Sequence, residues 1–128
     1  MIVLADSTAI IHLESQRTKM LDIINSLDIT ELYISRIGYL ELLGGASENS
    51  KIHVRKVLNT FKLLEFDVKA VKIASILSMR YRINSKQSKD FLIASTAIAN
   101  KLPLLTENTK DFSYKELKVI PYKISGII

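Results

Sequence analysis

The chain has 128 residues, 48% of them apolar, which suffices for one domain with a single hydrophobic core and excludes a disordered protein. Lys and Arg number 18 against 13 Asp and Glu, so the net charge is +5. A basic surface suits a polyanion such as nucleic acid, or an acidic partner protein. A solvated lysine-rich surface explains the charge equally well.

Cysteine is absent from the chain, which excludes disulfide bonds and thiolate metal sites and fits a reducing compartment. No run of about 18 apolar residues predicts a membrane span. The start of the chain, MIVLADSTAI, lacks the basic segment and the cleavage site of a signal peptide. We therefore expect a soluble, cytoplasmic protein with no membrane partner.

Short apolar runs predict strands, and apolar residues at helical spacing predict helices. In chain order the predicted elements are a strand at 2–5 and a helix after it, a strand at 30–35, helices at 37–46 and 54–61, a strand at 63–66, helices at 71–81 and 91–99, and strands at 103–106 and 118–122. Gly44 and Gly45 are expected to close the second helix. Residues 82–89 are expected to form a basic loop.

Strands that alternate with helices predict a parallel sheet, because parallel strands need long crossover connections. We therefore expect an α/β fold of three layers, with a central, mostly parallel sheet flanked by helices. In such sheets ligands bind beyond the carboxyl ends of the strands. Four polar features are expected at that edge: Asp6 after the first strand, Glu41 in the helix after the second strand, Asp90 at the opening of the helix before residues 103–106, and the turn at 108–111.

Carboxylates gathered at one edge repel each other, so one of them holds a proton or the group holds cations. Oxygen ligands of this kind suit Mg²⁺ or Mn²⁺. Three of the acids also have a simpler interpretation: Asp6 caps the first helix, Asp90 offsets a helix dipole, and Asp111 is a surface turn residue. Glu41 is harder to explain as a surface charge, because leucines surround it in the stretch YLELL.

Three stretches of the chain form an ordered set of motifs: IVLADSTAIIHLE, YISRIGYLELLGG and KDFLIASTAIANKLPLLTENTKDF. They contain an Asp followed by hydroxyl residues, a Glu in a leucine-rich helix, and an Asp-initiated, alanine-rich helix that leads into a strand and a polar turn. This set resembles the PIN-domain ribonucleases, of the kind found as the VapC toxin of toxin–antitoxin pairs. No single motif is specific, but the set covers essentially the whole chain and implies a single PIN domain at 1–128.

The resemblance implies a PIN-like fold and a metal-dependent endoribonuclease that hydrolyses RNA phosphodiester bonds with Mg²⁺ or Mn²⁺. Asp6, Glu41 and Asp90 match the acids that hold the metal in this family. Many relatives have a fourth acid where this chain has Asn108, and Asp111 follows three residues later. Both are therefore candidate catalytic residues. Polar residues that match the lining of the site are candidates for substrate binding: Ser7, Thr8 and Thr106.

Two protein partners are also implied by the resemblance. One is a second copy of the chain in a homodimer, and the other is a cognate antitoxin whose C-terminal segment lies over the active site. The predicted helices at 54–61 and 71–81 are candidate surfaces for either contact. Packing in the core explains their apolar stripes equally well.

Three cations near the acids are candidates for contacts with RNA phosphates: Arg36, Lys86 and Lys89. Arg36 precedes the helix that carries Glu41, and the two lysines precede Asp90. Exposed loop charges are the alternative interpretation of all three. His12 and His53 are interpreted as structural or surface residues.

Two other classes of protein are considered. A non-catalytic PIN domain that binds RNA or protein is compatible with Asn108 at the fourth position. A receiver-type signalling domain has a similar length and a parallel sheet, but it requires paired acids after the first strand and a phosphoacceptor Asp after the middle strand. The chain has one acid after the first strand and none at the end of LYIS, which argues against a receiver domain.

Overall fold

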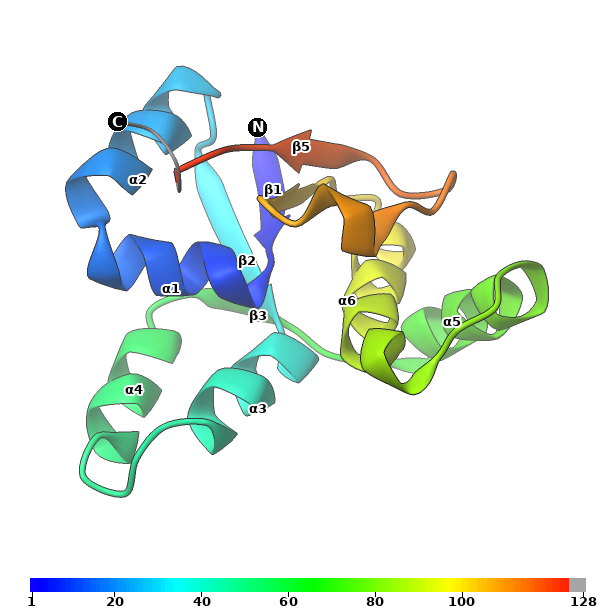
Figure 1. Cartoon of the computed structure of the whole chain (residues 1–128), viewed down its shortest axis with the longest axis horizontal. Coiled ribbons are helices and arrows are strands. Elements are labelled where there is room, and N and C mark those ends of the chain that lie inside the picture. The colour runs from blue at the N-terminus through cyan, green and yellow to red at the C-terminus, as the bar shows by residue number, and fades with distance from the viewer. Residues whose placement is uncertain (125–128) are drawn as a thin grey trace.

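The structure is a computed structural model that describes residues 1–124. The last residues of the predicted domain, 125–128, lie outside the described part of the chain. A five-stranded sheet runs through the centre of the molecule, with helices on both sides (Figure 1). The elements follow in the order β1 (Ile2–Ala5), α1 (Ser7–Ser15), α2 (Arg17–Ser26), β2 (Glu31–Ser35), α3 (Arg36–Gly44), α4 (Lys51–Leu58), β3 (Lys62–Leu64), α5 (Val68–Arg80), the 3₁₀ helix η1 (Ser85–Gln87), α6 (Ser88–Ala99), β4 (Leu104–Thr106), the 3₁₀ helix η2 (Thr109–Phe112) and β5 (Val119–Pro121).

The strand order across the sheet is β3-β2-β1-β4-β5, and every neighbouring pair is parallel. The first strand along the chain is therefore the central strand of the sheet. The strands predicted from apolar runs are confirmed, with ends that differ from the prediction by at most two residues. The predicted three-layer α/β class is confirmed as well.

The side chains of β1 explain why helices cover both faces of the sheet. Val3 and Ala5 belong to a core that includes residues of α1, α2 and α4. Leu4 belongs to a second core that includes residues of α5 and α6. Successive side chains of a strand point to opposite faces, so a central strand with two covered faces must be apolar throughout. The run IVLA at 2–5 meets this requirement.

Helix α2 is missing from the predicted elements. Its buried side chains are Met20 and Ile24, which lie one turn apart, and most of the other positions are exposed. Gln16 precedes the helix without making a side-chain cap hydrogen bond. A narrow apolar stripe without a start signal is a weak sequence pattern for a helix, and packing on the sheet stabilises α2 instead.

The helix that carries Asp90 begins earlier than the sequence predicts. The prediction has Asp90 opening the helix after a basic loop, whereas α6 begins at Ser88 directly after η1. Asn84 and Gln87 form a reciprocal capping box, in which each side chain accepts the backbone N–H of the other residue. This pair orders the segment that was expected to be a loop. Asp90 therefore lies within the first turn of α6, and Lys89 is a helical residue.

Two further helices are shifted relative to the prediction. Helix α4 ends at Leu58, and the backbone N–H of Phe61 closes a turn on the Leu58 carbonyl at 3.2 Å before β3 begins. Helix α5 begins at Val68, because the side chain of Asp67 caps it by accepting the backbone N–H of Ala70 at 3.1 Å. None of the helices within residues 1–124 is long and apolar enough to cross a membrane.

Candidate functional site

Asp6 follows β1 at the carboxyl edge of the sheet and is 4% exposed. One carboxylate oxygen accepts the backbone N–H of Thr8 and so caps α1, which agrees with the capping interpretation. The other oxygen accepts the hydroxyl of Thr106 at the end of β4. Burial raises the pKa of the Asp6 carboxyl, although these two hydrogen bonds oppose the rise. Each oxygen retains a lone pair, so capping does not exclude a second role.

Glu41 lies in α3, and three helices meet at its carboxylate. Oxygen Oε1 accepts the hydroxyl of Ser7 in the first turn of α1. Oxygen Oε2 lies 3.6 Å from the Lys89 ammonium nitrogen of α6. The negative charge of Glu41 also contributes to the raised pKa of Asp6. Asp6 and Glu41 are therefore electrostatic neighbours, although one follows β1 and the other lies in α3.

The close approach of α3 to α1 depends on Gly38, which the sequence analysis missed. A Cβ atom at this position would lie 3.2 Å from Oγ of Ser35 and 3.3 Å from Oγ of Ser7. Ser35 caps α3 by accepting the backbone N–H of Gly38 at 2.9 Å. The missing side chain leaves room for Ser7, whose hydroxyl then reaches Glu41. A serine at a strand end, followed three residues later by glycine within a helix, was the available signal in the sequence.

Asp90 occupies a partly buried position in the first turn of α6. Its pKa is raised to about 6, with burial as the largest cause. The like charges of Asp111, Asp6 and Glu41 add to the rise, in that order, and the Lys89 ammonium opposes it. The predicted acids therefore lie close enough for their charges to act on one another.

The turn after β4 contributes Asn108 and Asp111 in different ways. The backbone N–H of Asn108 donates to Oγ1 of Thr106 at 3.0 Å, and its side-chain amide lies 3.5 Å from Oγ1 of Thr8. Asp111 is exposed in η2, and its charge is the strongest like-charge influence on Asp90. The amide of Asn108 therefore faces α1, whereas the negative charge of Asp111 acts on Asp90 in the first turn of α6.

These acids do not form a ready coordination centre. Within residues 1–124, no group of three or more His, Asp or Glu side chains is arranged so that it could hold a metal ion. Asp6 accepts the hydroxyl of Thr106, and Glu41 accepts the hydroxyl of Ser7. The acids make up one electrostatic group, and two of its members, Asp6 and Glu41, already accept hydrogen bonds from side chains of the chain itself.

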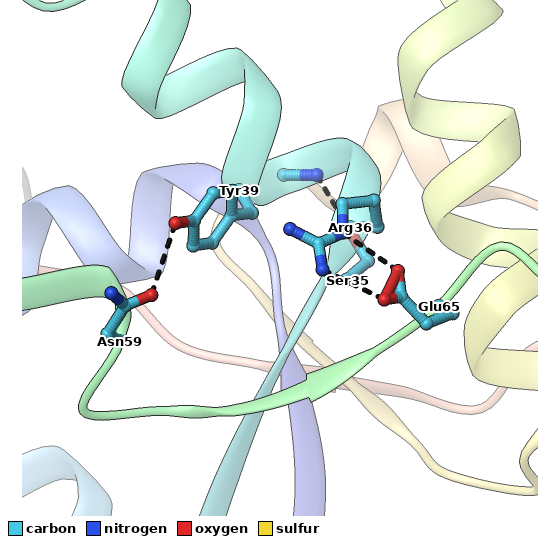
Figure 2. A network of polar contacts seen from close by, with 6 residues as sticks. Ser35, Arg36, Tyr39, Asn59 and Glu65 are labelled. Atoms are coloured by element: carbon cyan, nitrogen blue, oxygen red, sulfur yellow. Dashed lines mark hydrogen bonds and ion pairs between the residues drawn. The ribbon is translucent and has the colours of Figure 1, made fainter. Parts of the chain in front are cut away.

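Arg36 is engaged by an acid outside this group. Figure 2 shows its guanidinium facing Glu65, which follows β3, and the two Glu65 oxygens accept hydrogen bonds from Nε and Nη2 at 2.7 and 2.8 Å. The guanidinium carbon also lies 4.9 Å from the centre of the Tyr39 ring, and the Tyr39 hydroxyl donates to Asn59 at 3.1 Å. An RNA phosphate would have to compete with Glu65 for Arg36. Lys86 is an exposed residue of η1.

The two histidines have different surroundings. In α1, Nδ1 of His12 lies 2.7 Å from the hydroxyl of Tyr122, and the two rings meet edge to face. Burial raises the pKa of Tyr122, so its hydroxyl remains protonated and joins α1 to the segment after β5. His53 is exposed on α4. The contact of His12 fits the structural interpretation made from the sequence.

A groove of about 690 Å³ lies between α1, α3 and α4, and its lining includes Ser7 and Glu41. Apolar side chains from all three helices line it, among them Ile10, Leu42 and Val54. A segment bound along this groove would therefore reach Glu41 of the acidic site.

Replacing Thr106 by Val tests the hydroxyl that Asp6 accepts. Thr106 is fully buried, so this change of nearly the same shape would leave one buried oxygen of Asp6 without its hydroxyl donor and lower the free energy of unfolding by about 1 to 3 kcal/mol. Thr96→Val is the matched control, because Thr96 is equally buried but donates to the backbone carbonyl of Leu92 at 2.9 Å. Urea denaturation would measure both changes. Equal losses in the two variants would contradict a specific role of Thr106 at Asp6.

Comparisons with known proteins agree with this architecture. No curated protein sequence matches the chain. Among solved structures, a chain of VapBC2 from Rickettsia felis bound to a DNA fragment from its promoter has a TM-score of 0.77 and 21% identity, and the match covers 96% of this chain and 100% of that one. A chain of a toxin–antitoxin complex from Klebsiella pneumoniae has a TM-score of 0.75 and 28% identity, and the match covers 95% of this chain and 99% of that one. A chain of FitAcB from Neisseria gonorrhoeae has a TM-score of 0.70 and 25% identity, and the match covers 94% of this chain and 96% of that one.

The family comparison covers most of the chain. The model of the PIN domain matches residues 3–117, a range that begins in β1 and extends beyond η2. It includes Asp6, Glu41, Asp90 and Asp111. The motifs of the sequence, the parallel three-layer fold and this match lead to one conclusion: the chain belongs to the PIN-domain family.

Proposed function

We propose that this protein is the toxin of a VapBC-type toxin–antitoxin pair, that residues 1–128 make up a single PIN domain, and that it hydrolyses RNA phosphodiester bonds with the help of a divalent metal ion. The observation that carries the proposal is the electrostatic group at the carboxyl edge of the sheet. There, burial raises the pKa of Asp90 to about 6, and the like charges of Asp111, Asp6 and Glu41 add to the rise. Mutually repelling carboxylates at the ligand-binding edge of a parallel sheet favour a bound cation.

The residues of the group fit a divalent cation by donor type and by charge. All the acids offer carboxylate oxygens, which Mg²⁺ and Mn²⁺ prefer. Asp6, Glu41 and Asp90 would hold the ion. When bound, such an ion supplies a water of lowered pKa as the nucleophile and stabilises charge on the phosphate oxygens.

The other polar residues have proposed roles around these acids. Thr106 and Ser7 orient the carboxylates of Asp6 and Glu41, because each donates its hydroxyl to one of them. Asn108 and Asp111 complete the site from the turn after β4, Asn108 next to Thr8 and Asp111 next to Asp90. The residues proposed to contact substrate are Ser7, Thr8, Thr106, Arg36, Lys86 and Lys89.

The proposed protein partners are a cognate antitoxin and a second copy of the chain. Solved structures similar to this chain come from toxin–antitoxin complexes, including the one from Klebsiella pneumoniae at 28% identity. The groove between α1, α3 and α4 is lined largely by apolar side chains and also by Ser7 and Glu41, so an antitoxin segment bound there would cover Glu41. A short reading frame directly upstream of the gene, encoding a DNA-binding N-terminus, would support this assignment.

A non-catalytic PIN domain that binds RNA or protein is the second candidate function. Two observations favour it: the amide of Asn108 at the fourth acidic position, and the lack of a formed metal-binding group within residues 1–124. Such a protein would bind RNA without cutting it.

Cleavage of RNA by the purified chain in Mn²⁺ or Mg²⁺ tests the proposed activity. The comparison protein is the paired variant Asp6→Asn, Asp90→Asn, which keeps the shape of both side chains and removes two charges. We expect the parent chain to cut single-stranded or structured RNA and the paired variant to leave it intact. Equal, background-level cleavage by both proteins would rule out the nuclease and favour the binding module.

Thermal unfolding tests metal binding separately from cleavage. A ligand that binds only the folded state stabilises it by about 2.7 kcal/mol at a concentration about 100 times its Kd. We expect Mn²⁺ to raise the melting temperature of the parent chain and to leave that of the paired variant unchanged. A shift of the same size in both proteins would place the metal elsewhere on the chain.

A further inference from the structure

Lys89 brings a positive charge into the acidic group. It precedes Asp90 on α6, its side chain is 64% exposed, and its Nζ lies 3.6 Å from Oε2 of Glu41. The other oxygen of Glu41 accepts the hydroxyl of Ser7. Both oxygens of this carboxylate therefore have partners within the chain, and one of those partners is a cation.

The charge of Lys89 acts on more than one acid. It also acts electrostatically on the carboxylate of Asp90, the next residue of α6. A divalent cation would act in the same direction on the same carboxylates. Lys89 thus supplies part of the compensation that a metal ion would supply, from a side chain attached to the helix that carries Asp90.

Arg36 offers a contrast with Lys89. Its guanidinium forms two short hydrogen bonds with Glu65 and also lies over the Tyr39 ring, which fixes it in place (Figure 2). Lys89 has a longer contact and a mostly exposed, flexible side chain. Exposed ion pairs of this kind are weak and are exchanged at little cost.

We propose that Lys89 is a tethered counter-cation of the acidic site: its ammonium group occupies Oε2 of Glu41 and must leave that oxygen before a divalent ion can bind there. The proposal rests on the proposed metal dependence. Lys89 and the ion repel each other and compete for one carboxylate, so Lys89 lowers metal affinity and reduces the repulsion among the acids until the ion arrives. An exposed pair of this strength corresponds to about a two- to fivefold weakening of metal binding.

Isothermal titration of the full chain with Mn²⁺, without RNA, tests this exchange. Lys89→Gln removes the ammonium, Lys89→Arg keeps a positive charge at the same place, and Lys72→Gln removes one lysine charge from an exposed position of α5. We expect Lys89→Gln to bind Mn²⁺ about two to five times more tightly than the parent chain. Lys89→Arg and Lys72→Gln should bind Mn²⁺ like the parent, and the gain of Lys89→Gln should shrink at about 0.5 M salt because screening weakens exposed pairs.

Three results would overturn the proposal, and they have different meanings. Unchanged or weaker Mn²⁺ binding by Lys89→Gln would show that the lysine does not compete with the ion. An equal gain in Lys72→Gln would show an effect of net charge in place of a local exchange. Absence of Mn²⁺ binding by the parent chain would overturn the proposed metal dependence itself together with the role of Lys89, whereas the first two results leave the metal dependence intact.

Discussion

Replacing Asp6 by Asn should reduce Mn²⁺-dependent RNA cleavage by about a hundredfold or more while leaving the fold intact. The loss is large because a metal ion contributes several kcal/mol of transition-state stabilisation, and each 1.36 kcal/mol is about tenfold in rate. The fold should survive because Asn is as good a helix cap as Asp, so the introduced amide oxygen can still accept the backbone N–H of Thr8. Cleavage of a fluorescent RNA and urea denaturation would measure the two effects.

Asp67→Asn is the matched control for this substitution. Asp67 caps α5 as Asp6 caps α1, and it is exposed and lies outside the acidic group. The control should retain parental cleavage, and both variants should keep the free energy of unfolding within about 1 kcal/mol of the parent. If Asp6→Asn keeps cleavage within a few fold of the parent, the carboxylate of Asp6 is not a metal ligand and its role is confined to the cap.

Replacing Asp90 by Asn should abolish cleavage and, in the absence of metal, make the protein more stable above pH 6. The pKa of Asp90 is about 6 in the folded chain against 3.8 as the ordinary value. Between these values the folded state binds more protons than the unfolded state, so the contribution of Asp90 to stability falls as the pH rises. Above pH 6 its ionised carboxylate is partly buried and is also repelled by Asp111, Asp6 and Glu41, and Asn removes both the cost of burying the charge and the repulsion.

The expected gain in unfolding free energy is about 1 to 2 kcal/mol at pH 8, after allowance for screening by solvent, and it should vanish towards pH 4. Urea denaturation in EDTA at the two pH values would measure it. Asp22→Asn removes one acid from an exposed position on α2 and should show no such pH-dependent gain. A destabilised Asp90→Asn protein at pH 8 would mean that the carboxylate is stabilised where it lies, which contradicts a repulsive acidic group. A substitution that removes activity and increases stability is expected for an acid that serves function at a cost in stability.

The strands were predictable because their apolar runs are local signals. In the strand IVLA at 2–5, Val3, Leu4 and Ala5 must be apolar, since β1 is the central strand and these residues are buried on its two faces. Helix α2 was not predicted because Met20 and Ile24 are its only buried residues, which leaves a weak apolar pattern, and its stability comes from packing on the sheet. The start of α6 was misplaced because the capping box of Asn84 and Gln87 lies in a segment of polar, loop-like composition.

The sequence by itself determined the class of fold, the family and the set of acids. The fold class and the acids follow from periodicity and from the position of each acid relative to a strand end, and the family follows from the resemblance of the ordered motifs; all are properties of the sequence itself. Only the tertiary structure decided which groups these acids meet. Thr106 donates to Asp6 across 100 residues, Ser7 donates to Glu41 across 34, and Lys89 reaches the same Glu41 from another helix. Such pairs depend on how helices pack around the sheet, because a side chain's partner is set by the distance between elements in space and leaves no local pattern in the sequence.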